Sequence, residues 1–156
     1  MIKKLSIWLA STLTGVALLS GCAELQEMGL TGATAEDMKF FSNLVYVDVG
    51  DNMMPFECLG PLPALEELHI HCNMIKKISN TKGFPRLEIL DLSYNKIAEI
   101  APTIGNMLSL EKLNLACNRI VNLDNRIADA QSLTYLDLSG NAMSRAPREL
   151  AKLCSL

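Results

Sequence analysis

Two histidines, His69 and His71, stand one residue apart, and two carboxylates, Asp48 and Asp91, lie 21 and 22 residues to either side of His69. Imidazole nitrogens and carboxylate oxygens are ligands that a divalent metal ion accepts. The sequence therefore raises a metal-binding alternative at His69 and His71. Whether these four side chains could converge on one ion depends on the elements that position them. The sequence also shows no evident residues that would hold the ligands in place by hydrogen bonds.

Signatures of catalysis are missing from the sequence. It contains no Gly-rich phosphate loop, no HExxH, no nucleophile elbow and no CxxC. Cys72 follows His71 directly, but a thiol and an imidazole on an open strand do not define a nucleophile and its base. We therefore expect a protein that is not an enzyme and needs no cofactor.

Length and charge narrow the class of protein. A chain of 156 residues has room for one domain with a short appendage, and its apolar content of 49% is enough for a packed core. The formal net charge is -3, with 14 basic and 17 acidic residues. A broad basic face for nucleic acid is therefore disfavoured, and we expect no nucleic-acid partner.

The N-terminal segment has the pattern of an export signal. Lys3 and Lys4 precede an uncharged stretch that ends in small residues. The stretch closes on Leu19-Ser20-Gly21-Cys22, which resembles the bacterial lipobox. The resemblance implies that residues 1–21 are a lipoprotein signal peptide and that Cys22 becomes a lipid-bearing N-terminus, anchored in the cell membrane or the outer membrane. The alternative is a cytoplasmic protein whose leader does not function.

Residues 22–39 are expected to form a tether and an N-terminal capping element. Gly29 and Gly32 interrupt any long helix. Thr34 begins a sequence that resembles a capping box, which predicts a short helix from about residue 35 to residue 43. Such a helix would cover the first apolar edge of the segment that follows.

Residues 40–156 repeat one pattern five times. The repeats start at residues 44, 65, 87, 110 and 133, with periods of 21, 22, 23 and 23 residues, and one of them reads Leu87-x-x-Leu90-x-Leu92-x-x-Asn95. This pattern resembles the leucine-rich-repeat family, in its typical and SDS22-like classes. The resemblance implies an α/β solenoid with a short parallel concave sheet of about five strands and an irregular or short-helical convex side.

The spacing has a physical interpretation of its own. The fourth and sixth residues of each repeat alternate inward on a short strand, so the residues between them face outward. The asparagine that ends each strand is predicted to bond neighbouring main-chain groups and so to build a structural ladder from coil to coil. The ladder residues are Asn52, Asn73, Asn95, Asn118 and Asn141.

The last repeat is expected to lack a cover. A solenoid coil buries its apolar face only against its neighbours, and Leu156 stands where a sixth repeat would open. We therefore expect that the natural product continues, pairs with another chain at this edge, or is represented here by a fragment, and we favour the fragment. Cys72 and Cys117 lie two repeats apart, roughly 10 Å, and are expected to remain free thiols.

The outward positions are the predicted binding surface. Tyr46, Tyr94 and Tyr135 would act as anchors, because tyrosine buries a large area at little entropic cost. Asp48, Asp91 and Asp137 would form an acidic stripe that favours a basic partner. The predicted partner-binding residues are Tyr46, Asp48, Glu67, His69, His71, Ile89, Asp91, Tyr94, Lys112, Asn114, Tyr135 and Asp137.

The sequence thus predicts a membrane-tethered leucine-rich-repeat scaffold that binds an unidentified protein partner on its concave face. The alternatives are an intracellular leucine-rich-repeat adaptor and the metal site at His69 and His71. Because His69 is expected between Asp48 and Asp91, we also predict that its pKa is raised, so that any stability from this contact is present at low pH and is lost as the pH rises past the raised value.

Overall fold

The computed structural model describes residues 16–18, 42–53 and 55–156. Cys22, the tether, the predicted capping helix up to residue 41 and all of the predicted signal peptide except residues 16–18 lie outside the described residues. The domain boundaries proposed from the sequence therefore remain predictions.

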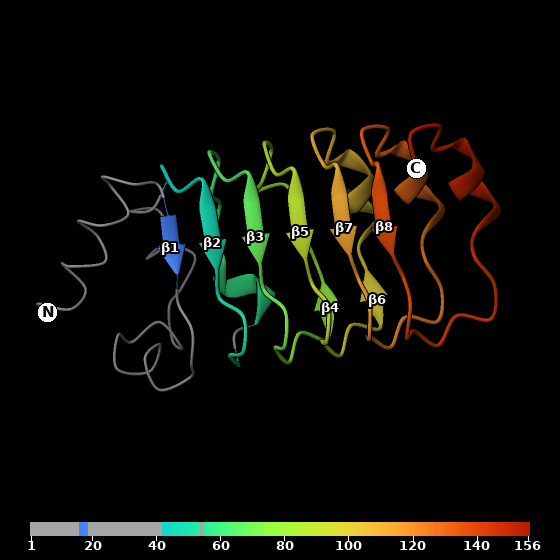
Figure 1. The fold of residues 1–156 in the computed structure, drawn as a ribbon, viewed down its shortest axis with the longest axis horizontal. Coiled ribbons are helices and arrows are strands. Elements are labelled where there is room, and N and C mark those ends of the chain that lie inside the picture. Colours follow the sequence, from blue (N-terminus) through green and yellow to red (C-terminus); the bar gives the residue numbers. More distant parts are fainter. Residues whose placement is uncertain (1–15, 19–41, 54) are drawn as a thin grey trace, which may run out of the picture.

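The main sheet has six parallel strands in the order β1-β2-β3-β5-β7-β8, which lie side by side along the length of the molecule (Figure 1). The last five strands come from the five repeats, so the predicted solenoid is confirmed. β1, which lies within the predicted signal peptide, was not expected. The strands are β1 (Val16–Leu18), β2 (Tyr46–Asp48), β3 (Glu67–His69), β5 (Ile89–Asp91), β7 (Lys112–Asn114) and β8 (Tyr135–Asp137).

Each of the first four repeat strands buries its middle residue and leaves its two outer residues at least partly accessible. This alternation follows from the two-residue period of a strand. The fourth and sixth residues of the first four repeats are no more than 2% exposed: Val47, Val49, Leu68, Ile70, Leu90, Leu92, Leu113 and Leu115. In the fifth repeat, Leu136 and Leu138 are only half-buried, because no further coil covers them within the described residues.

The return path of each coil uses short elements. Two strands, β4 (Lys77–Ile78) and β6 (Glu99–Ile100), pair in parallel to form a second, smaller sheet. Single 3₁₀ turns then lead back to the main sheet. Ile104 and Ile127, at the centres of two of these turns, are buried in the core. These turns are η2 (Phe56–Cys58), η3 (Pro102–Asn106), η4 (Asn125–Asp129) and η5 (Arg148–Lys152). The predicted short-helical convex side is therefore present.

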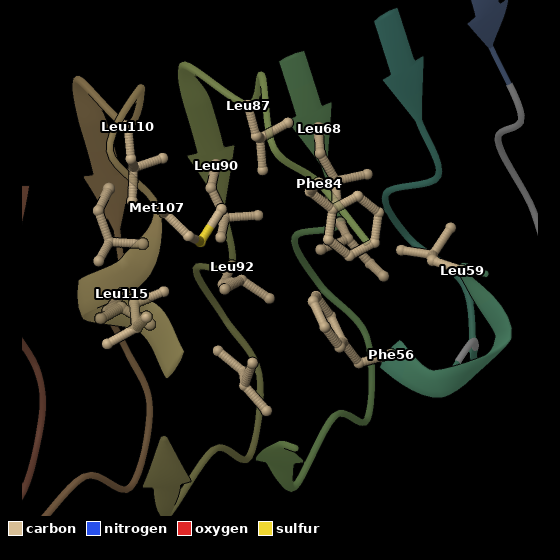
Figure 2. Close-up of a cluster of buried hydrophobic side chains, with 14 of the residues drawn as sticks. Phe56, Leu59, Leu68, Phe84, Leu87, Leu90, Leu92, Met107, Leu110 and Leu115 are labelled. Atoms are coloured by element: carbon tan, nitrogen blue, oxygen red, sulfur yellow. The ribbon is translucent and has the colours of Figure 1, made fainter. Parts of the chain in front are cut away.

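The core lies between the strands and this return path. Figure 2 shows leucines of successive strands packed beside Met107, with Phe56 and Phe84 toward the first repeats. The rings of Phe56 and Phe84 meet edge to face, with centroids 5.8 Å apart and an interplanar angle of 62°. Because each leucine is covered by the coils beside it, the core is continuous along the solenoid.

The ladder asparagines connect one coil to the next. The Nδ2 group of Asn95 donates to the carbonyl of Ile70 in the preceding coil at 3.0 Å, and Oδ1 of Asn95 accepts from the backbone N–H of Ile75 at 3.1 Å. Asn118 and Asn141 make the equivalent pairs of bonds with their own preceding coils. Each amide oxygen thus accepts from a backbone N–H of the preceding coil. Each amide nitrogen gives a second hydrogen bond to a strand-end carbonyl that also accepts from the asparagine of its own repeat.

Candidate functional site

The outward residues of the main sheet form straight rows across the strands. Strand pairing places Tyr46, Glu67, Ile89, Lys112 and Tyr135 in one row, and Asp48, His69, Asp91, Asn114 and Asp137 in a second. Each row therefore presents one side chain from every coil. We call this accessible side of the main sheet the strand face.

The acidic residues of the second row have a structural task. Oδ1 of Asp48, Asp91 and Asp137 accepts a hydrogen bond from the backbone N–H two residues later, at 2.8–2.9 Å, and Asn114 does the same at 3.1 Å. Such a bond holds the chain in the turn that ends the strand. One carboxylate oxygen of each aspartate is thus engaged. The second oxygen of Asp48 and of Asp91 is left for solvent or a partner, whereas that of Asp137 lies near the Tyr135 hydroxyl.

His69 interacts with different groups from those expected. The sequence predicted contacts with Asp48 and Asp91, and these residues do flank His69 in the row. Their carboxylates, however, accept hydrogen bonds from the backbone N–H two residues further along their own chain segments. Nε2 of His69 instead lies 3.6 Å from Oε2 of Glu67 on the same strand, and its ring stands 5.3 Å from the ring of Tyr46.

The tyrosines of the strand face have neighbouring carboxylates. Burial raises the pKa of Tyr46, with smaller contributions from Asp48 and Glu67. The charge of Asp137 raises the pKa of Tyr135, whose hydroxyl lies 3.4 Å from Oδ2 of Asp137. Both phenols therefore remain neutral hydrogen-bond donors at physiological pH.

A third group of residues lies one position before each ladder asparagine. Asp51, Cys72, Tyr94 and Cys117 all have a φ between 51 and 55°, and Gly140 has a φ of 65°. The left-handed conformation at this turn costs any residue other than glycine some backbone strain. It projects Tyr94, which is 62% exposed, beside the strand face, where a hydrogen bond with Cys117 raises the pKa of the tyrosine.

His71 occupies space that a glycine makes available. A Cβ atom on Gly50 would collide with the His71 ring, so only glycine leaves room for this position of the imidazole. Nε2 of His71 lies 3.9 Å from Oδ2 of Asp51. His71 is therefore packed against the preceding coil.

The structure also aligns three glutamates that are not among the predicted binding residues. The second position of three successive repeats is a glutamate: Glu66, Glu88 and Glu111. The backbone N–H of Glu88 donates to the backbone carbonyl of Glu66 at 2.8 Å, and that of Glu111 donates to the backbone carbonyl of Glu88 at 2.8 Å. Like charges on adjacent strands repel one another. The repeat period itself could have revealed this row.

The strand face and its margin are consequently strongly acidic. Among the described residues, one basic side chain, Lys112, accompanies eight carboxylates in the outward positions of the repeats. These carboxylates are Asp48, Asp51, Glu66, Glu67, Glu88, Asp91, Glu111 and Asp137. The surface can therefore attract and orient a positively charged partner.

Two further expectations bear on this region. Within the part of the chain that the structure describes, no three His, Cys, Asp or Glu side chains come together as ligands for a metal ion. Cys72, Cys117 and Cys154 are free thiols.

Among the same described residues, no helix combines the length and apolar character that crossing a membrane requires.

Comparison with protein families supports the repeat assignment. A model described as "Leucine rich repeat" matches residues 85–143, and a model described as "Leucine Rich repeats (2 copies)" matches residues 63–105. The chain is 35% identical over 75 residues to X-ray radiation resistance-associated protein 1 of Mus musculus. That match covers 47% of this chain and 10% of the mouse protein.

Solved structures show the same architecture. A leucine-rich-repeat protein of Leptospira interrogans is 27% identical with a TM-score of 0.65, over 76% of this chain and 30% of that protein. The leucine-rich-repeat ectodomain of the plant membrane receptor kinase GASSHO1/SCHENGEN3 of Arabidopsis thaliana, solved with CASPARIAN STRIP INTEGRITY FACTOR 2, is 22% identical with a TM-score of 0.65. It covers 76% of this chain, which spans 15% of that structure.

Proposed function

Because residues 63–143 consist of leucine-rich repeats, we propose that this chain is a non-enzymatic scaffold that binds a basic protein partner on its strand face. The observation that carries the proposal is the distribution of charge: four carboxylates and one lysine lie on the repeat strands of a rigid sheet, and four more carboxylates lie next to these strands. A surface held in place by a packed core loses little conformational entropy when it binds.

Within this surface, different residues have different roles. Tyr46, Tyr94 and Tyr135 supply aromatic contact area on or beside the strand face. The second oxygens of Asp48, Asp91 and Asp137 supply charge. The remaining predicted contacts, Glu67, His69, His71, Ile89, Lys112 and Asn114, stand between these groups in the rows of the sheet or just beyond the strands.

Affinity capture of a partner, followed by two matched triple variants, tests the proposal. The first variant carries Glu67→Gln, Asp91→Asn and Asp137→Asn, in which asparagine preserves the Oδ1 acceptor that each turn needs. The second carries Glu99→Gln, Asp129→Asn and Glu149→Gln, which remove the same charge elsewhere. We expect the first variant alone to lose the partner. Equal retention by both variants would contradict binding on the strand face.

We also propose that Cys22 is acylated and that the module is tethered to a membrane. The support is the lipobox-like sequence from Leu19 to Cys22 behind a basic start. Metabolic labelling with radiolabelled palmitate should mark the wild-type protein and leave Cys22→Ala unmarked. Absence of label from the wild-type protein would favour the intracellular adaptor.

The metal alternative has its own test. Equilibrium dialysis with zinc compares the wild-type chain with a variant in which His69 and His71 are both replaced by alanine. Zinc binding that disappears in this variant would support the alternative. Equal binding by the two proteins would remove it, in keeping with the separate surroundings of the two rings.

A further inference from the structure

β1 completes the main sheet from within the predicted signal peptide. Val16–Leu18 pairs in parallel with β2, with Val16 in register with Tyr46, Ala17 with Val47 and Leu18 with Asp48. β1 lies next to β2 at the N-terminal end of the row of strands (Figure 1). It thus occupies the outer edge of the first repeat strand, a position that repeat proteins must cover.

Backbone geometry identifies which groups of β2 face this neighbour. The carbonyl of Val45 accepts from Glu67 N–H at 3.0 Å, and Val49 N–H donates to His69 at 2.8 Å, so the odd-numbered residues of this segment face β3. In a parallel sheet, the N–H and the C=O of one residue point to the same neighbouring strand, and those of the next residue point to the opposite side. The peptide groups of Tyr46 and Asp48 therefore face β1, and those of Ala17 lie between them.

We propose that the outer edge of β2 is a strand-exchange site whose resident strand is Val16–Leu18. In the uncleaved chain this segment closes the sheet. Cleavage before Cys22, which is part of the proposed function, removes the same residues and opens the edge to another parallel strand. A pairing only three residues long is short enough to exchange.

The site adjoins the proposed binding surface. In the backbone register, Val16 stands opposite Tyr46 and Leu18 opposite Asp48, the first members of the two rows. While the resident strand is in place, the backbone edge beside Tyr46 and Asp48 is covered, whereas its departure leaves Tyr46 and Asp48 on the edge strand of the sheet. Leader retention and partner binding are thereby linked through one edge of the sheet.

Hydrogen exchange of the full-length Cys22→Ser chain tests the pairing. Its intact mass must first show that residues 1–21 are retained. Ala17→Pro removes an N–H that faces β2, whereas the control Val16→Pro removes one that faces away, which an edge strand tolerates. We expect Ala17→Pro to speed exchange at Tyr46 and Asp48 by on the order of tenfold or more.

Val47 and Val49 provide an internal standard, because their amides face β3 and should keep their protection in both variants. A synthetic peptide with the sequence of residues 12–22, carrying serine for Cys22, is then added to the Ala17→Pro chain. Restored protection at Tyr46 and Asp48 supports exchange, with a scrambled peptide as control. Equal exchange at these two amides in all variants, or no effect of excess peptide, overturns the proposal.

This experiment is independent of the proposed function. It uses an uncleaved chain without lipid and without a protein partner, so its failure would leave acylation and partner binding untouched. Conversely, a chain that is never acylated would still show the pairing of β1 with β2. The two sets of results can therefore be distinguished.

Discussion

Two columns of polar residues run along the solenoid, and they bond the backbone in different directions. The ladder asparagines lie inside and reach the preceding coil, as Asn95 does with Ile70 and Ile75. The second row of the strand face lies outside, and Asp91 reaches only Ser93 in its own repeat. The first column couples neighbouring coils, while the second shapes individual turns.

This difference separates stability from recognition. Asn95 is 6% exposed and all of its bonds go to protein, so it has nothing to offer a partner. Asp91 is half-buried and keeps one carboxylate oxygen for binding. We therefore expect substitutions of the ladder asparagines to lower mainly the stability of the fold, and substitutions in the second row to weaken mainly the binding of a partner.

Replacing a buried ladder asparagine should have the largest effect. Asn95→Ala removes the acceptor of the buried Ile75 N–H and the donors to Ile70 and Leu92, and should lower the free energy of unfolding by about 3 kcal/mol. Asn141 makes the same bonds but is half-buried, so water can replace them, and Asn141→Ala should cost about 1 kcal/mol. Urea unfolding followed by circular dichroism measures both. Equal losses would contradict the role of burial.

Asp91 should separate charge from turn formation. Asp91→Ala removes the acceptor of the Ser93 N–H and should cost about 1 kcal/mol. Asp91→Asn keeps the acceptor and should leave the unfolding free energy nearly unchanged while weakening partner binding. Chemical unfolding and a binding titration with the captured partner give the two results. A large loss of stability in Asp91→Asn would show that the charge itself holds the turn.

Tyr94 tests the strained turn between the two columns. Its φ of 54° suits glycine, so Tyr94→Gly should be more stable than Tyr94→Ala by about 1 kcal/mol, the reverse of the usual order. Both variants lose the exposed ring and should bind the partner more weakly. Thermal unfolding of the pair, which differ by one methyl group, isolates the backbone contribution. A more stable alanine variant would contradict the assigned strain.

Asp137 should give the smallest effect, visible as a pH dependence. The Ser139 hydroxyl and backbone N–H lower the pKa of Asp137 below its usual 3.8, so the folded state favours the ionised carboxylate. The stability that this gives is present above pH 3.8 and is lost as the pH falls through the lowered value. In Asp137→Asn, the free energy of unfolding should therefore depend less steeply on pH in this acidic range. An unchanged slope would exclude a contribution from Asp137.

Much of the fold could be predicted from spacing. Leucines at the fourth and sixth positions and an asparagine at the ninth define a strand and its end, because a two-residue period and a buried amide leave little other choice. The rows on the strand face follow from the same period, as the register of Asp48, His69 and Asp91 shows. The expected placement of outward residues therefore needed no tertiary information.

The remaining features depend on side-chain rotation and long-range pairing. The sequence placed His69 between two aspartates, but it does not show that both carboxylates bond their own turns and leave Glu67 and Tyr46 as neighbours. Likewise, Val16–Leu18 lies in a segment with the composition of an export signal and does not carry the repeat pattern. Its pairing with β2, which covers the outer edge of the sheet, could therefore not be predicted from the repeats.

The unstaggered register of the strands has a geometric consequence for any ligand. Successive side chains in a row are separated by the distance between strands, about 4.8 Å. An α-helix laid across the strands advances about 5.4 Å per turn, so it can present one lysine or arginine to each coil for several coils before it falls out of step. An extended peptide repeats its facing side chains every 6.6 Å or so and loses alignment sooner. The straight rows therefore suit a basic helix that crosses the strands.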